Sequence, residues 1–276
     1  MNRYLKLVNF EFTRFLKLYM VLTGITLLIQ VIGVMLESRK YVGRANNAIY
    51  EELLSKREFI EQYGKMSFLN FSQTGWFLGP IVLCGVTLLI YVFFIWYRDW
   101  LGKNTFSYRL LVLPTARINV YLAKATTIFL FVLGLVAWQL VLIPVETQVL
   151  QWMIPAEFYT DISVTEITNL YLLNILVPQT FTDFILYYGA GMAAVCIVFT
   201  AILFERSFGL KGIIFGIVYC AVSLLLILAP VLVNEFVLGN YFYPIELFYL
   251  EVGAGLLAWA GAISIGNYLI NKKIRV

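Results

Sequence analysis

Six stretches of the chain hold no charged residue, and each is about as long as a membrane-spanning helix. The stretches contain 19 to 22 residues each and run over residues 18–36, 76–96, 125–145, 184–204, 212–233 and 252–270. An α-helix needs about 20 apolar residues to cross roughly 30 Å of hydrocarbon at about 1.5 Å per residue. The pattern therefore predicts an all-α, polytopic membrane protein with six transmembrane helices in a single transmembrane domain over residues 1–276.

The composition agrees with this pattern and excludes a soluble enzyme. Hydrophobic residues make up 61% of the chain and charged residues only 13%, whereas an ordinary soluble domain has roughly 25% charged residues. The first stretch is longer than the apolar part of a signal peptide, which has about 7 to 15 residues, and Gly33–Leu36 lacks a small-x-small cleavage site. We therefore expect it to remain as the first transmembrane helix.

The charges between the apolar stretches predict the orientation of the chain. Positive charge is in excess in residues 1–17, 98–124, 205–211 and 271–276, which together carry a net charge of +11. Residues 37–75, 146–183 and 234–251 together carry −7. Because Lys and Arg favour short cytoplasmic loops, we expect both termini to be cytoplasmic in a plasma-membrane protein and the three acidic or neutral segments to be outer loops.

Three of the intervening segments have helical patterns of their own. Residues 2–17 have apolar and basic positions on opposite sides, which predicts an amphipathic helix at the inner membrane surface. In the first outer loop, the spacing predicts a short helix that ends near Gly64. In the second, Ser163–Glu166 has the pattern of a capping box, and we expect a helix from there that stops before Pro178. This helix either lies on the outer leaflet or packs as a lid over the spans.

The chain lacks the residue types on which intramembrane chemistry usually depends. It contains no histidine, and none of the six apolar stretches contains a charged residue. It also has no G-x-x-x-x-G-K-Ser/Thr sequence of the kind that binds nucleotide phosphates. We expect the chain to carry no catalytic site, metal or cofactor, and Asp183 to act as a helix cap rather than a coupling residue. If ATP drives the protein, another chain binds it.

Small residues recur at every fourth position in the sixth apolar stretch, at Ala254, Ala258, Ala262 and Gly266. Such a stripe allows two helices to approach closely, either within the bundle or at a subunit interface. The apolar stretches contain few polar residues. This composition favours a hydrophobic or amphipathic cargo over a polar solute if the protein is a transporter.

The basic segment between the second and third stretches contains the most specific pattern. Asp99 is followed by Gly102 and Thr105, by the sequence Leu111–Arg117, which contains Pro114, and then by Lys124. A short helix is expected over about residues 104–111 before Pro114 turns the chain. This arrangement resembles the membrane (permease) subunits of type-2, ABC-2-like, ATP-binding-cassette exporters. Here Asp99 stands where Glu is more usual, and two residues separate Gly102 from Thr105.

The resemblance implies a specific function and a set of residues that perform it. It implies a permease subunit that moves a peptide, an antimicrobial or a lipid-like compound, pairs with a second permease, and binds two copies of an ATPase subunit that holds ATP and Mg²⁺. The cytoplasmic coupling helix that contacts the ATPase would then include Asp99, Thr105, Phe106, Tyr108, Arg109, Leu111, Pro114 and Arg117. The interface helix before the first span would include Glu11, Phe12, Arg14 and Phe15.

Two other functions stay open at this point. The chain could be a non-transporting immunity or scaffold protein that sequesters a peptide or organises a complex, which predicts no nucleotide-dependent activity with any partner. An intramembrane enzyme would need a catalytic group that the pattern of residues does not supply.

Overall fold

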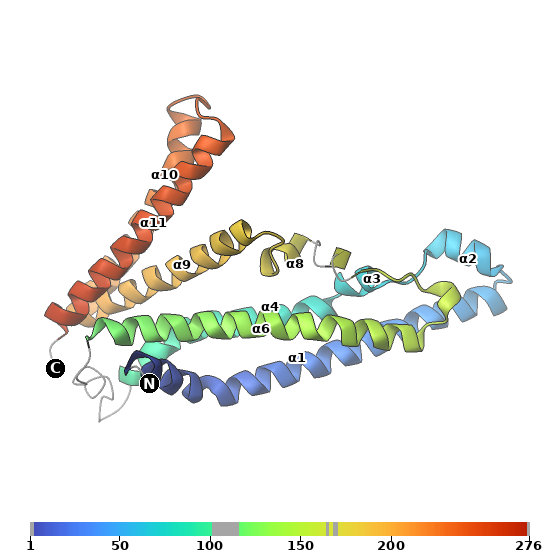
Figure 1. The fold of residues 1–276 in the computed structure, drawn as a ribbon. Coiled ribbons are helices and arrows are strands. Elements are labelled where there is room, and N and C mark those ends of the chain that lie inside the picture. Colours follow the sequence, from blue (N-terminus) through green and yellow to red (C-terminus); the bar gives the residue numbers. More distant parts are fainter. Residues whose placement is uncertain (1–2, 101–115, 164–165, 168–170, 275–276) are drawn as a thin grey trace. The chain divides into compact units, whose positions relative to one another are not determined.

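The structure is a computed structural model that describes residues 3–100, 116–163, 166–167 and 171–274, all of them helical or in short connections (Figure 1). Its elements are α1 (Arg3–Tyr50), α2 (Lys56–Tyr63), α3 (Phe68–Ser72), α4 (Gly75–Trp100), α6 (Ile118–Met153), η1 (Ala156–Phe158), α8 (Tyr171–Leu176), α9 (Phe181–Phe208), α10 (Leu210–Phe236), α11 (Pro244–Tyr268) and the π-helical turn η2 (Leu269–Lys273). Within the described part, no strand forms beyond one isolated bridge between Met66 and Tyr159.

Six of these helices are long and apolar enough to cross a membrane, which confirms the prediction of a multi-pass membrane protein. They are α1, α4, α6, α9, α10, and α11 together with η2. Each charge-free stretch lies inside one of them. Prolines occur within three, at Pro80, Pro144 and Pro230, as transmembrane helices tolerate when neighbouring groups satisfy the freed carbonyls.

Two helices continue well beyond their apolar stretches. α1 extends to Tyr50, 14 residues past Leu36, and α6 extends to Met153, eight residues past Val145. At 1.5 Å per residue these extensions add about 21 Å and about 12 Å. At its other end α1 begins at Arg3, so the segment predicted as a separate interface helix is the first part of one helix.

The chain divides into two compact units. Unit 1 consists of Met1–Arg14, Leu88–Leu130 and Thr182–Val276, and unit 2 consists of Phe15–Thr87 and Phe131–Phe181. Each unit has its own buried side chains, and we describe them in turn.

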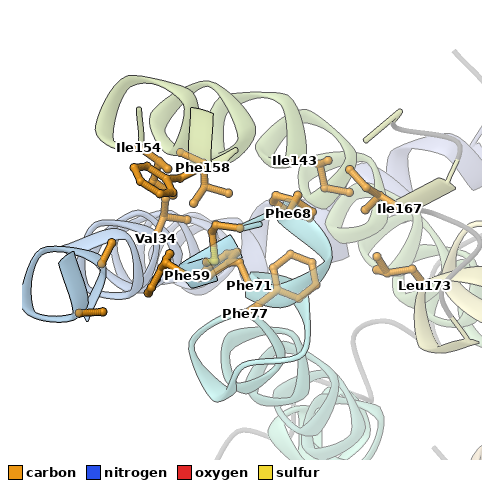
Figure 2. Close-up of a cluster of buried hydrophobic side chains, with 14 residues drawn as sticks. Val34, Phe59, Phe68, Phe71, Phe77, Ile143, Ile154, Phe158, Ile167 and Leu173 are labelled. Atoms are coloured by element: carbon orange, nitrogen blue, oxygen red, sulfur yellow. The ribbon is translucent and has the colours of Figure 1, made fainter. Parts of the chain in front are cut away.

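Unit 2 is built around an apolar core to which two of the three predicted outer loops contribute, 37–75 and 146–183. Phe68, Phe71 and Phe77 make edge-to-face contacts with centroids 5.7 to 5.8 Å apart, a favourable arrangement for aromatic rings. Figure 2 shows the core side chains converging from α1, α3, α4 and α6. The buried members of this core are Val34, Ala45, Ala48, Phe59, Met66, Phe68, Phe71, Phe77, Ile143, Leu150, Ile154, Phe158, Ile167 and Leu173.

Backbone hydrogen bonds join the two loops around this core. The Met66 N–H donates to the Phe158 carbonyl, and the Thr160 N–H donates to the Met66 carbonyl, both at 2.9 Å. We call the packed body formed by residues 37–75 and 146–163, with Ile167 and Leu173, the cap. Since Ile167 and Leu173 are buried in its core, the segment after Ser163 belongs to the cap rather than to an isolated surface helix.

Local capping signals begin and end the short helices of the cap. Ser55 opens α2 with a capping box to Glu58, and the helix ends at Gly64, which has a positive φ of 72°. The short helix predicted to end near Gly64 is therefore confirmed. The Ser163–Glu166 capping box is also confirmed, because the Ser163 N–H donates to Glu166 Oε2 and the Glu166 N–H donates to Ser163 Oγ.

Unit 1 contains the antiparallel hairpin of α10 and α11, together with α9 and the first part of α6 (Figure 1). The turn between α10 and α11 is shorter than the predicted outer loop 234–251. α10 continues to Phe236, and α11 starts at Pro244, before the charge-free stretch begins, where the Tyr243 N–H donates to Glu246 Oε2 at 3.0 Å. Acidic residues at the helix ends thus fall inside the helices rather than in a loop.

Candidate functional site

The site candidate is a buried group of charged side chains in unit 1. Lys124 in α6 is only 1% exposed, and its ammonium group lies 2.8 Å from Glu11 Oε1 and 2.5 Å from Asp99 Oδ2. The ammonium group also donates a hydrogen bond to the Ile95 carbonyl at 2.9 Å. Glu11 and Asp99 are 2% and 1% exposed. A lysine this deeply buried is rare unless it is paired, and here its three donors all have acceptors.

Two arginines complete the group at its edge. Arg14 donates to Asp99 Oδ1 at 2.7 Å, and Arg98 donates to Glu11 Oε2 at 2.8 Å. Their side chains are 24% and 19% exposed. Every oxygen of the two carboxylates therefore accepts a hydrogen bond from a cation, and the group as a whole carries one net positive charge. We call Glu11, Arg14, Arg98, Asp99 and Lys124 the charge cluster.

The charge cluster joins three helices, α1, α4 and α6, and two of them flank the predicted coupling segment in the sequence. Glu11 and Arg14 lie one turn apart on α1, Arg98 and Asp99 come from the last turn of α4, and Lys124 comes from the second turn of α6. α4 ends at Trp100 and α6 begins at Ile118. The segment predicted to couple with an ATPase therefore begins at one member of the cluster, Asp99, and ends at Arg117, seven residues before another member, Lys124.

The end of α4 also holds α9. The Tyr97 hydroxyl donates to Glu205 Oε2, and the guanidinium of Arg206 lies 5.1 Å from the Tyr97 ring centroid and 4.7 Å from that of Trp100. Such cation–aromatic contacts are each worth about 0.5–2 kcal/mol, depending on desolvation. Four consecutive residues, from Tyr97 to Trp100, thus attach the end of α4 to α9, α1 and α6.

Arg117, another of the predicted coupling residues, contacts the C-terminal turn. Its Nη1 donates to the carbonyls of Ile270 and Ile274 at 3.2 and 3.4 Å. These carbonyls belong to and follow the π-helical turn η2, at the end of the described chain. Arg117 therefore attaches the C-terminal turn to the beginning of α6, and it is not a member of the charge cluster.

The remaining residues of the predicted coupling and interface sites are distributed as follows. Asp99 is at the centre of the charge cluster, with Glu11 and Arg14. Phe15 is buried in unit 2, where its ring contacts Phe131 with centroids 4.8 Å apart, and Phe12 is half-buried. Six predicted coupling residues lie outside the described residues: Thr105, Phe106, Tyr108, Arg109, Leu111 and Pro114.

The small-residue stripe of α11 faces other helices of unit 1. Ala254, Ala258, Ala262 and Gly266 are all buried. The Thr200 hydroxyl of α9 donates to the Ala262 carbonyl at 2.8 Å, and a Cβ at Gly266 would lie 3.1 Å from Thr200 Oγ1 and from the Tyr121 ring. The stripe therefore packs inside the chain, against α9 and α6, by the close approach that small residues allow.

Sequence reasoning selected Glu11, Arg14 and Asp99 as site residues for other reasons and named Lys124 only as part of the family-like pattern. It did not select Arg98, and it predicted none of the ion pairs among these residues. The available signal was the sign of the charges at the ends of the apolar stretches. Arg98 and Asp99 follow one stretch closely, and Lys124 immediately precedes the next. Opposite charges at the ends of neighbouring spans can pair, but only the fold shows that Glu11 forms ion pairs with Arg98 and Lys124. Among the described residues, no three His, Cys, Asp or Glu side chains converge as a metal site.

Comparison with known proteins assigns no family to the chain. No protein family matches the sequence, no curated protein is similar to it, and no solved structure matches the fold. The function therefore has to be inferred from the residues of the charge cluster and from the segment that they flank.

Proposed function

We propose that this chain is the permease subunit of an ATP-driven, ABC-2-like exporter, and that the segment from Asp99 to Arg117, with its short helix over about residues 104–111, couples it to a separate ATPase subunit. In this proposal the chain pairs with a second permease and with two ATPase subunits in the plasma membrane, with both termini in the cytoplasm. ATP and Mg²⁺ belong to the ATPase. The chain supplies the path for a hydrophobic or amphipathic cargo, in keeping with its six apolar helices.

The single observation that carries this proposal is the charge cluster. It joins Glu11 and Arg14, two of the residues chosen as an interface helix, to Asp99 and Lys124, two positions that belong to the family-like pattern. These residues come from three helices, two of which, α4 and α6, flank the segment in the sequence. A coupling segment needs such an anchor, because a force on a loop moves the helices only if the loop ends are held firmly.

The contacts at the end of α4 supply a physical route for coupling. Nucleotide binding can bias the membrane helices only if the ATPase contacts differ between its two states. Displacement of the segment at Trp100 acts on α1 and α6 through Asp99, and on α9 through Tyr97. Buried ion pairs resist separation, since each partner would be left uncompensated. The helices of unit 1 therefore respond together.

The proposal is tested by purifying the tagged full-length chain in mild detergent from its native membrane. Co-purifying chains are identified and ATPase activity is measured for the wild type and for a double variant, Tyr108→Ala with Arg109→Ala. We expect a P-loop ATPase to co-purify, and the variant to lower the amount bound by at least about tenfold, which corresponds to about 1.4 kcal/mol of binding free energy.

A matched control replaces an aromatic and a basic residue outside the segment, Tyr268→Ala with Lys272→Ala. Both residues are exposed, and we expect the control to retain the ATPase. A folded wild-type chain that brings no ATPase with it would overturn the exporter proposal and favour the sequestering or scaffold function. Equal losses in the two double variants would place the contact elsewhere.

A further inference from the structure

One carboxylate in unit 2 is buried without a partner in the described part of the chain. Glu146, in α6, has no solvent exposure, and neither of its carboxylate oxygens has a hydrogen-bond partner among the residues that the structure describes. No cation lies within ion-pair distance of it among the described residues. It is the first residue after the third charge-free stretch and the first of the acidic outer-loop segment 146–183.

The surroundings of Glu146 are those of a hydrophobic core. It lies three residues after Ile143 and four before Leu150, so the three side chains project from one face of α6. Ile143 and Leu150 are both fully buried members of the cap core, which also contains Phe68, Phe71 and Phe77 (Figure 2). The polar group therefore shares its face of α6 with side chains that cannot form hydrogen bonds with it.

An ionised carboxylate is strongly unfavourable in such a place. Transfer of an unpaired charge from water to an apolar interior costs so much free energy that the group becomes neutral instead. For Glu146 this means that one carboxyl oxygen carries a proton while the cap is packed. Ionisation would require either water or a cation to reach the carboxylate, and both would have to separate the side chains around it.

We propose that Glu146 is a proton-binding site that controls the packing of the cap. With the proton bound, the cap core closes over a neutral side chain. Loss of the proton creates a charge that only a more open, hydrated cap can accommodate. The inference does not depend on the exporter function, because it concerns this chain alone.

The charged groups of the elements around the core do not neutralise Glu146. Those on residues 37–50 of α1, on α2, on η1 and on their connections are exposed except for Glu37, which is half-buried and pairs with Lys40 at 3.6 Å. α3, α8 and the first part of α4, residues 75–87, contain no charged residue. The charged residues considered are Glu37, Arg39, Lys40, Arg44, Glu51, Glu52, Lys56, Arg57, Glu58, Glu61, Lys65, Glu157, Asp161 and Glu166.

Proton linkage gives the direction of the expected effect. In the unfolded chain a glutamate releases its proton near pH 4.3, whereas the packed cap retains it. Above about pH 4.3, and for as long as the packed cap retains the proton of Glu146, the folded protein binds one proton more than the unfolded chain. The folding equilibrium constant therefore falls as the pH rises, by up to tenfold per pH unit. The chain contains no histidine, so no other side chain with an ordinary pKa titrates between about pH 6 and about pH 8.

The test measures thermal unfolding of the full-length protein in detergent at about pH 6 and about pH 8, for the wild type and for Glu146→Gln. The glutamine has nearly the same shape and cannot ionise. We expect the wild-type midpoint to fall by about 4 °C or more across this range and the midpoint of the variant to stay within about 1 °C. Hydrogen exchange in residues 37–75 should increase with pH in the wild type only.

Gln139→Leu is the matched control. Gln139 lies two turns earlier on the same helix and is also buried, but it does not titrate, so this variant should keep the pH dependence of the wild type. An infrared spectrum of the wild type at neutral pH provides a second readout that requires no stable variant, since a protonated carboxyl has its own carbonyl band. Equal pH dependence in the wild type and Glu146→Gln would overturn the proposal. So would a wild-type spectrum without the protonated carboxyl band.

Discussion

Two buried acidic sites in this chain are built in opposite ways. In unit 1, the four carboxylate oxygens of Glu11 and Asp99 all accept hydrogen bonds from Arg14, Arg98 or Lys124. In the described part of unit 2, neither oxygen of Glu146 has a hydrogen-bond partner. In the first arrangement each charged group is held by a partner of opposite charge, so its geometry depends little on pH. In the second, the buried carboxyl stays neutral only while it binds a proton, so its packing depends on pH.

The distribution of charge along the chain accounts for this difference. All five residues of the charge cluster come from segments 1–17 and 98–124, which have an excess of Lys and Arg, so cations are available to both carboxylates. Segment 146–183 has five acidic residues and no basic one. A carboxylate buried there has no cation near it in sequence, and the bases of the first outer loop are exposed at the surface of the cap.

The largest effect should follow from removal of the central cation. Lys124→Met leaves Glu11 and Asp99 buried with only the two edge arginines, and breaking a buried ion pair in this way costs about 3–5 kcal/mol. We expect a correspondingly lower midpoint of thermal or denaturant unfolding, with the loss concentrated in unit 1 when hydrogen exchange is followed. Lys272→Met removes an exposed lysine from the same unit and should change stability by less than about 0.5 kcal/mol.

A compensating change distinguishes loss of pairing from loss of packing. Adding Asp99→Asn to Lys124→Met removes one of the two buried carboxylates that lose their hydrogen bond from the lysine in the first substitution. If charge causes the loss, the double variant should be more stable than the sum of the two single effects predicts, by about 0.5–3 kcal/mol. Simple additivity would show that the lysine acts through its hydrocarbon stem.

A smaller effect of opposite sign is expected at the unpaired site. Glu146→Leu replaces a buried, unsatisfied carboxyl by an apolar side chain of similar size within an apolar core. Removal of such a group should raise the free energy of unfolding by about 1–3 kcal/mol at neutral pH. The measurement is denaturant unfolding beside the wild type and Glu157→Gln, which alters an exposed carboxylate. A destabilised Glu146→Leu would indicate that the carboxyl has a partner after all.

The contrast also shows how far the sequence predicts this structure. The spanning helices were predictable because the membrane excludes charge and demands internally satisfied backbone, so a charge-free stretch of the right length has few alternatives. α2 was predictable because its limits, Ser55 and Gly64, are set by neighbouring residues. Packing of the cap was not predicted, since no local pattern connects Phe68 of one loop with Phe158 of the other.

Lys124 and Glu146 show most clearly what the sequence does not predict, which is whether a charged residue at the end of a span is buried. Lys124 immediately precedes one charge-free stretch and Glu146 immediately follows it, so both were assigned to the boundary of a span, where water is available. The structure buries both, with 1% and 0% exposure. A charge ends an apolar stretch equally well whether it faces water, a partner or a hydrophobic core, and only the other helices decide among these. The coupling role of the segment from Asp99 to Arg117 stays a prediction, carried by its resemblance to a coupling segment.

The smallest effect concerns an exposed carboxylate of the cap, Glu58, whose partners are the Ser55 backbone N–H at 2.8 Å and the Ser55 hydroxyl. These hydrogen bonds, the backbone one first, hold the pKa of Glu58 below its usual value. Its contribution to α2 is therefore present above the usual pKa and is lost as the pH falls through the lowered one, opposite in direction to Glu146.

Ser55→Ala removes the hydroxyl that caps α2 and should cost about 1 kcal/mol of local stability. Faster hydrogen exchange confined to residues 56–63 is the expected result at neutral pH. Ser55→Asp keeps a side-chain acceptor at the cap and should retain protection. If Ser55→Ala instead lowered protection from hydrogen exchange throughout the cap, the local role of this capping residue would be contradicted. The result would show that α2 is essential to the core around Glu146.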